Sequence, residues 1–259
     1  MQPTIPVPLF AIALLVGMLL LVELGRRLGT RRLSQETQAG RGDLGGIEAA
    51  VFGLFSLLIA FTFGGAAERF GEKRMLIAEE ANDIGTAYLR LDLVPRDKQL
   101  ALRELFRKYL DSRLDTYRKL PDMVAAREEM AKSKSLQNEI WSNAVLATRL
   151  PESHSAAGML LLPALNNMID IATTRTMALQ NHPPGIIFAL LFALGLICSL
   201  LAGYRMANDP RRSWLHILGF TLFTVIIVNV ILDIEYPRIG SIRLGNYDQV
   251  LVDLRDSMR

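Results

Sequence analysis

The chain has 259 residues, of which 51% are hydrophobic and 21% charged, and its formal net charge is +3. The polar segment 68–184 holds 17 Lys and Arg against 16 Asp and Glu. It therefore lacks the excess of positive charge that binding to nucleic acid needs, and we expect no nucleic-acid partner. A single cysteine, Cys198, excludes an intrachain disulfide and a cysteine-based metal site.

Four apolar stretches are the main feature of the chain: 7–24, 47–67, 185–207 and 214–234. A helix needs roughly 20 apolar residues, with about 17 as the lower limit, to cross the hydrocarbon core of a bilayer. In lipid the backbone N–H and C=O groups must pair with one another, so only helices and closed β-barrels can cross a bilayer. Barrel strands would alternate apolar and polar residues, whereas these stretches are continuously apolar. The sequence therefore predicts an all-α integral membrane protein with four transmembrane helices in a lipid bilayer.

The first stretch has no positively charged region before it, and Arg26 and Arg27 follow it in place of a cleavage site. We therefore expect it to be a retained membrane helix and not a signal peptide.

Between the second and third stretches lies the polar insert, which Pro95, Pro121 and Pro151 divide into segments of helical length. Its first segment has no proline and is expected to continue the second membrane helix, while Pro163 is expected to kink the last segment. Apolar side chains recur at three- and four-residue spacing, which predicts an antiparallel helical bundle inserted between the second and third membrane helices. The tail has an amphipathic pattern that predicts a short helix docking on this bundle.

This organisation divides the chain into four parts. Residues 7–67 form the first transmembrane pair, 68–184 the extramembrane helical bundle, 185–234 the second transmembrane pair, and 235–259 the C-terminal segment that docks on the bundle.

Arginines predict the orientation in the membrane. With four crossings, the loops 25–46 and 208–213 lie on one side, and both are rich in arginine. The positive-inside rule places that side in the cytoplasm, so the insert and both termini are expected outside it, in a bacterial inner membrane. Basic residues directly after the second stretch favour the opposite orientation. The loop arginines are Arg26, Arg27, Arg31, Arg32, Arg41, Arg211 and Arg212. The opposing residues are Arg69, Lys73 and Arg74, together with Arg238 and Arg243 after the fourth stretch.

The second apolar stretch has distinct faces when its residues are placed at about 100° intervals around a helix. A ridge of small residues is the pattern that lets membrane helices approach closely, so we expect it to pack within or between subunits. The ridge consists of Ala49, Gly53, Ser56, Ala60, Gly64 and Ala67. Beside the ridge lies a stripe that starts with an acidic residue and continues with large apolar ones. It consists of Glu48, Phe52, Phe55, Ile59 and Phe63.

Two interpretations of the stripe remain open. In the functional one, Phe52, Phe55, Ile59 and Phe63 line a hydrophobic pore constriction that gates ions by dewetting, with Glu48 at the pore mouth. In the structural one, the aromatic side chains pack on a neighbouring helix, and Glu48 favours the positive end of the helix dipole.

Other polar residues are candidates for function in the membrane or in the insert. Asn229 and Asp233 lie four apart on the last apolar helix, and polar groups at membrane depth are costly. Polar runs at 79–90 and 166–175 fit either buried inter-helix networks or ion vestibules, or else solvated faces and structural salt bridges. His182 precedes two prolines at the start of the third apolar stretch and is either a pH sensor or an ordinary structural residue. We find no catalytic or metal-binding motif, and expect neither an enzyme nor a cofactor.

Several motifs resemble a bacterial membrane family that carries a bestrophin-like domain, and together they cover nearly the whole chain. The motifs are Glu-Ala-Ala-Val-Phe-Gly-Leu at 48–54, Glu-Glu-Ala-Asn at 79–82, Asn-Asn-Met-Ile-Asp at 166–170, His-Pro-Pro at 182–184 and Asp-Ile-Glu-Tyr-Pro-Arg-Ile-Gly at 233–240.

The more distant resemblance to true bestrophins implies an oligomeric anion channel with four membrane helices and a pore neck on the second helix. In that analogy Phe52, Phe55, Ile59 and Phe63 take the place of the neck. Two features depart from it: bestrophins keep the insert in the cytoplasm, and the acidic calcium-binding cluster is not recognised here.

We therefore expect an oligomeric ion channel that assembles from copies of this chain and passes inorganic ions. The alternative is a non-conducting envelope sensor or scaffold protein whose helical insert binds a partner.

Overall fold

The structure is a computed structural model, and it describes residues 7–33, 45–120, 122–208, 212–237, 242, 244–245 and 247–258. Residues 41, 121, 211, 238–240 and 243, discussed above, lie outside this set. The described residues form helices and no strand, and four of the helices are long and apolar enough to cross a membrane. This confirms the prediction of an all-helical chain with four long apolar helices.

The chain forms two compact units. Unit 1 comprises Met1–Glu68 and His182–Tyr236, and unit 2 comprises Arg69–Asn181 and Pro237–Arg259.

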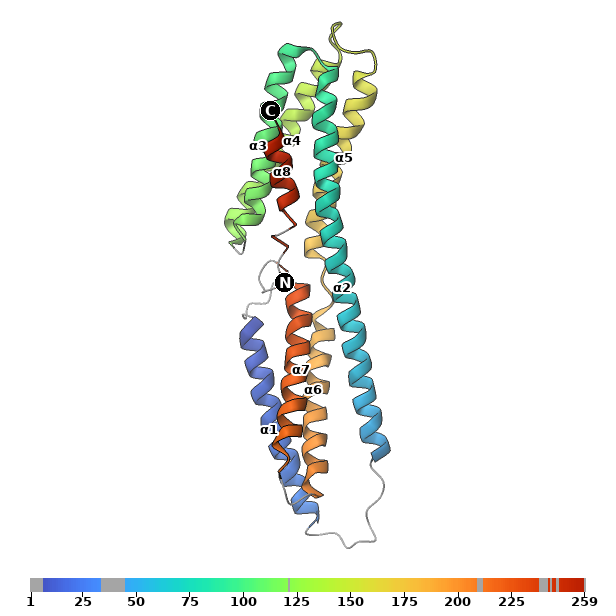
Figure 1. Ribbon diagram of the computed structural model, residues 1–259, viewed down its shortest axis with the longest axis vertical. Coiled ribbons are helices and arrows are strands. Elements are labelled where there is room, and N and C mark those ends of the chain that lie inside the picture. Colours follow the sequence, from blue (N-terminus) through green and yellow to red (C-terminus); the bar gives the residue numbers. More distant parts are fainter. Residues whose placement is uncertain are drawn as a thin grey trace. The chain divides into compact units, whose positions relative to one another are not determined.

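In unit 1, α1 (Val7–Leu33) packs against both α6 (Gly185–Arg205) and α7 (Trp214–Glu235), and the unit also holds the first part of α2 (Gly45–Leu89) (Figure 1). The short η3 (Met206–Asn208) follows α6 and contacts α1. In the most apolar window of α7, 44% of the residues are buried, against 17% in α2, so α2 is the less enclosed helix.

The end of α1 differs from the prediction. The helix continues beyond the apolar stretch to Leu33, so Arg26, Arg27, Arg31 and Arg32 lie on a helix and not in a loop. Arginine is a good helix former, and α1 stays in contact with α6 and η3 along this end, which explains the extension.

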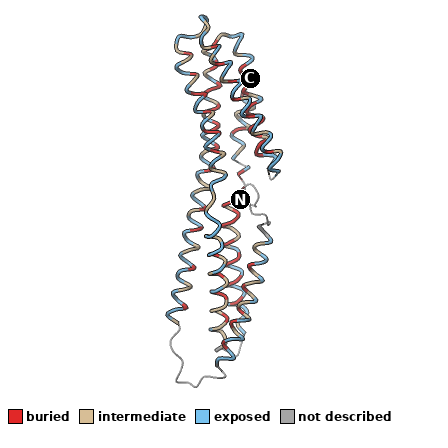
Figure 2. Tube along the Cα trace, turned by 180° about the vertical axis from the view of Figure 1, so that it is seen from behind, coloured by how far each residue is buried: buried red, intermediate tan, exposed pale blue. Residues whose placement is uncertain are grey.

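Helix α2 runs without a break from Gly45 to Leu89, and η2 (Arg90–Leu93) follows it directly. The first proline after Gly45 is Pro95, and the helical conformation ends just before it. In the apolar part of α2, the buried residues recur on one side only, and most of its surface is half-buried or exposed (Figure 2).

Unit 2 is a helical bundle built from the second part of α2, α3 (Arg96–Arg118), α4 (Met123–Thr148), α5 (Ala157–Gln180) and the tail helix α8 (Gln249–Ser257). Asp122 caps α4, because its carboxylate accepts hydrogen bonds from the backbone N–H of Val124 and Ala125. Pro163 lies within α5, which continues through it.

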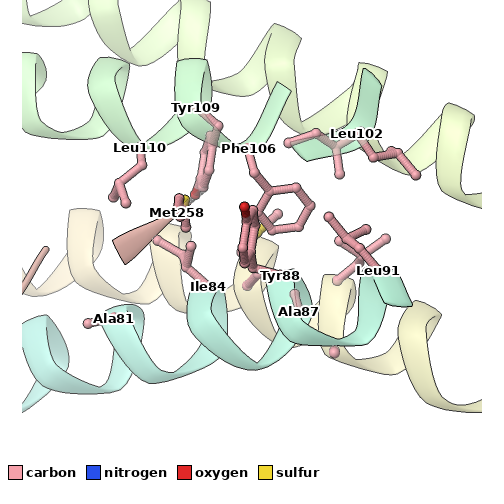
Figure 3. Packing of buried hydrophobic residues seen from close by; sticks show 14 of the residues in the cluster. Ala81, Ile84, Ala87, Tyr88, Leu91, Leu102, Phe106, Tyr109, Leu110 and Met258 are labelled. Carbon is pink, nitrogen blue, oxygen red and sulfur yellow. The ribbon is translucent and has the colours of Figure 1, made fainter. Parts of the chain in front are cut away.

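The core of unit 2 forms where α2 faces α3. Figure 3 shows Ile84 and Tyr88 of α2 and Leu91 of η2 pointing toward Phe106 and Tyr109 of α3. The Tyr88 and Phe106 rings meet edge to face, with their centroids 5.8 Å apart.

Helix α8 packs against α3, and its buried Leu251 belongs to the core of unit 2. Arg255 donates two hydrogen bonds to the carboxylate of Asp111 on α3, at 2.7 and 3.0 Å. The tail is therefore held to the bundle by both apolar burial and a bidentate ion pair.

Candidate functional site

The apolar part of α2 turns most of its aromatic stripe toward the other helices of unit 1. Phe55 is 3% exposed, and its ring lies against Gly195 of α6. The ring of Phe52 meets that of Phe220 on α7 edge to face, at a centroid distance of 5.8 Å. Ile59 is half-buried in the same core, whereas Phe63 is 43% exposed. Phe55 is thus enclosed by packing within one chain, whereas Phe52 and Ile59 pack with only part of their surface, and Phe63 is the most accessible member of the stripe.

The ridge of small residues faces away from these contacts. Every ridge residue is exposed within the single chain: Ala49, Gly53, Ser56, Ala60, Gly64 and Ala67. A Cβ atom added at Gly53 or Gly64 would meet no atom within 4 Å. Nothing in the described part of this chain therefore fills the ridge at these two glycines.

Glu48 lies in the first turn of α2 and is nearly buried. Its carboxylate accepts a hydrogen bond from the Arg205 guanidinium at the end of α6, with an N–O distance of 3.1 Å. The Arg205 side chain is 68% exposed, so this pair lies at the edge of unit 1 with the cation facing outward. The charge of Glu48 is thus partly compensated within the chain.

Asn229 is half-buried and Asp233 is buried on α7. Close to Asp233 in sequence, Glu235 is fully buried, and its carboxylate lies 3.0 Å from Nδ1 of His182. The Tyr236 ring lies over the imidazole, with a centroid distance of 4.5 Å. Glu235 and Tyr236 therefore contact the segment that precedes α6 through His182.

Helices α1 and α6 meet at a contact that the sequence analysis missed. A Cβ atom added at Gly203 would lie 2.0 Å from the carbonyl oxygen of Val22, and one at Gly25 would lie 2.0 Å from that of Leu200. At Gly29 the corresponding distance to the Tyr204 carbonyl oxygen is 2.6 Å. Only glycine permits such an approach of two backbones, and the four-residue spacing of Gly25 and Gly29 is the sequence signal for it.

Unit 2 has a buried charge network that joins the two polar runs found in the sequence. Glu80 is fully buried, and its carboxylate accepts hydrogen bonds from Arg113, at 2.5 Å, and from Arg175. Arg175 also donates to the carboxylate of Asp248, at 2.7 Å. The Tyr117 ring lies beneath the Arg175 guanidinium, 3.9 Å from its centroid.

Burial on its own would raise the pKa of Glu80, but the positive charges of Arg113 and Arg175 outweigh it and hold the pKa below its usual value. The exposed members of the two runs, such as Asn82 and Asp170, lie outside this network on the surface. The runs therefore combine a buried network with solvated faces.

Within the described residues, no group of three or more His, Cys, Asp or Glu side chains is placed to hold a metal ion. The candidate site is thus a surface of apolar and small side chains along α2 with an ion pair at its first turn.

Two solved structures are similar to this chain, and both are variants of a bacterial bestrophin homologue from Klebsiella pneumoniae. The variant with a tryptophan-to-alanine substitution has a TM-score of 0.71 and 13% identity, and the match covers 95% of this chain and 98% of the other. The variant with a tyrosine-to-alanine substitution has a TM-score of 0.61 and 14% identity, with 93% and 98% covered. At this identity the likeness shows a shared fold.

No curated protein sequence matches the chain. The family model of the Bestrophin-like domain, however, matches residues 10–246, which is nearly the whole chain. This chain belongs to the Bestrophin-like family.

Proposed function

We propose that this protein is an ion channel in which α2 of several identical copies surrounds the conduction path. The observation that carries this proposal is the family match over residues 10–246, together with a shared fold with bestrophin homologues. The low enclosure of α2 supports it, because an apolar helix with a large uncovered surface is available for contacts with other copies.

The constriction in this proposal lies on the edge of the aromatic stripe. Phe52, Ile59 and Phe63 fall within an arc of about 40° on a helix and span roughly 16 Å along its axis. Phe55 lies behind them against Gly195, so we assign it to the support of the constriction. A passage lined by such side chains excludes water and limits conduction by dewetting.

The ridge is the proposed contact between copies. Small residues let membrane helices approach closely, and the ridge lies beside the stripe on the same helix. Glu48 stands at the first turn of α2, where its charge would act on ions at a mouth of the path.

Conduction is tested by reconstituting the purified protein into planar bilayers with an asymmetric salt gradient. Phe63→Ala should raise the conductance, because the smaller side chain widens and wets the constriction. Phe61→Ala is the matched control: Phe61 is 70% exposed on a different face of α2, so its truncation should leave the conductance unchanged. Glu48→Gln should shift the reversal potential and leave the path open.

Silent bilayers for the wild type and all three variants, with intact oligomers present, would reject the channel and leave a non-conducting scaffold. Equal conductance changes in Phe61→Ala and Phe63→Ala would reject the assigned face of α2.

Assembly is tested separately with Gly53→Leu and Gly64→Leu. Since both positions are open within the chain, each leucine should leave the protomer folded and break the oligomer, as measured by native mass spectrometry. Gly219→Leu on α7, which is also exposed and open, is the control and should keep the oligomer. Unchanged oligomers in both α2 variants would show that the ridge faces lipid.

A further inference from the structure

We propose that the arginine end of unit 1 binds the phosphate headgroup of an anionic phospholipid. The arginine end is the set of charged residues where α1 and α6 end and α2 and α7 begin. Among the described residues it has six arginines and two carboxylates, which leaves a net charge of +4: Arg26, Arg27, Arg31, Arg32, Arg205 and Arg212 against Glu23 and Glu48. The lipid proposal does not depend on the channel proposal, because its phosphate ligands are Arg27, Arg31 and Arg212; Glu48, which stands at the mouth of the proposed path, only counts toward the net charge.

Two of these arginines are held together across a helix contact. The carboxylate of Glu23 accepts hydrogen bonds from Arg27, at 2.9 Å, and from Arg212, at 2.7 Å. One carboxylate cannot use all ten N–H donors of two guanidinium groups. The side chains of Arg27 and Arg212 are 70% and 43% exposed, so donors remain accessible from outside. Arg31 follows Arg27 one turn later on the same face of α1.

The two helices beneath the arginines are in close backbone contact. Gly25, Gly29 and Gly203 bring the backbones of α1 and α6 into direct contact within the same turns. The Arg32 guanidinium also donates to the hydroxyl of Tyr204 on α6, at 2.8 Å. The arginines are therefore placed before a ligand arrives, which lowers the entropic cost of binding.

The position along the helices fits a headgroup. The apolar stretch of α1 ends at residue 24, just before the arginines, and α7 begins at Trp214, just after Arg212. The Arg212 guanidinium lies over the Trp214 ring, 5.6 Å from its centroid. Tryptophan marks the boundary between lipid and water, and that is the depth of the phosphate groups.

The chemistry favours an anionic lipid over a zwitterionic one. Guanidinium groups bind phosphate oxygens with paired hydrogen bonds, and a net positive end attracts a lipid that carries net negative charge. Each arginine near such a surface should contribute about a fivefold preference. The two carboxylates lower the preference without reversing its sign.

Trp214 provides a direct readout. The chain has two tryptophans, so Trp141→Phe leaves Trp214 as the sole indole. In vesicles, brominated phosphatidylglycerol should quench Trp214 fluorescence more than brominated phosphatidylcholine at equal mole fraction. Arg27→Gln with Arg31→Gln should lower this selectivity about fivefold for each arginine. Lys108→Gln with Arg118→Gln removes two exposed charges from α3 in unit 2 and should leave it unchanged.

A second measurement avoids the tryptophan substitution. Native mass spectrometry is done on proteins that keep Trp141. Phosphatidylglycerol should remain bound to the wild type and to the α3 variant (Lys108→Gln with Arg118→Gln), and be lost from the α1 variant (Arg27→Gln with Arg31→Gln). Equal quenching by the two lipids, or equal retention in the α1 variant, would overturn the proposal. Displacement of the lipid by excess inorganic phosphate would also overturn it, because the site would then bind a soluble anion.

Discussion

Gly203→Ala should destabilise unit 1, although alanine is the better helix former. The added Cβ would lie 2.0 Å from the Val22 carbonyl oxygen, roughly 1.4 Å closer than an ordinary contact. Overpacking costs about 1–3 kcal/mol, and a conflict with backbone belongs at the upper end, since no side chain can turn away. The helix propensity of alanine offsets about 1 kcal/mol of this. The expected net loss is about 2 kcal/mol, or a Tm lowered by roughly 4–8 °C.

Cys198 makes this loss measurable in detergent. It is the only cysteine, and it is buried on α6, so a thiol-reactive dye reports the unfolding of unit 1 during heating. Gly219→Ala is the matched control, because a Cβ there meets nothing within 4 Å and the helix propensity of alanine should keep or raise the Tm. If Gly203→Ala unfolds at or above the temperature of the wild type, α1 and α6 do not approach as described.

Three further results are expected. Glu80→Gln should cost about 3–5 kcal/mol in circular dichroism melts, because it leaves two buried arginines facing a neutral side chain. Since the pKa of Glu80 is lowered on folding, its contribution is complete above the ordinary value of 4.5 and falls as the solution is acidified below it. Glu80→Gln should therefore lose less stability than the wild type when the pH falls below 4.5, and an identical pH dependence of unfolding in the two proteins would contradict the network. Phe55→Ala should cost about 3–5 kcal/mol by analogy with soluble cores and open no new current; a stable variant with larger conductance would place Phe55 in the path. Ser135→Cys, made with Cys198→Ser, should react with an impermeant maleimide in intact spheroplasts, as the proposed outward insert requires, and labelling only after lysis would reverse the orientation.

Hydropathy predicted the four long apolar helices and the absence of strands from the described chain, because hydrocarbon permits few structures. It did not predict which face of α2 packs within the chain. The stripe around Phe55 and the ridge around Gly53 are both apolar, and lipid is as apolar as a helix surface. Only the positions of α6 and α7 decide that the side of α2 around Phe55 is covered within the chain and that the ridge around Gly53 is not.

Other features depended on partners far away in the sequence. The arginines predicted a loop after residue 24 because charge was taken as the end of the helix, yet Gly25 and Gly29 let α1 continue along α6. The polar runs were visible in the sequence, but Glu80 and Arg175 are 95 residues apart, and only the fold brings them together.

The charge network of unit 2 also has a consequence for the order in which the protein is made. Glu80, Arg113 and Arg175 leave the ribosome before α6 and α7, whereas Asp248 follows them. At about 5–20 residues per second, the stretch from Asn181 to Asp248 takes roughly 3–13 s to synthesise. During that interval the buried network has two arginines, Arg113 and Arg175, for the single carboxylate of Glu80. The network can therefore reach its final charge balance only after the last two apolar helices have been translated.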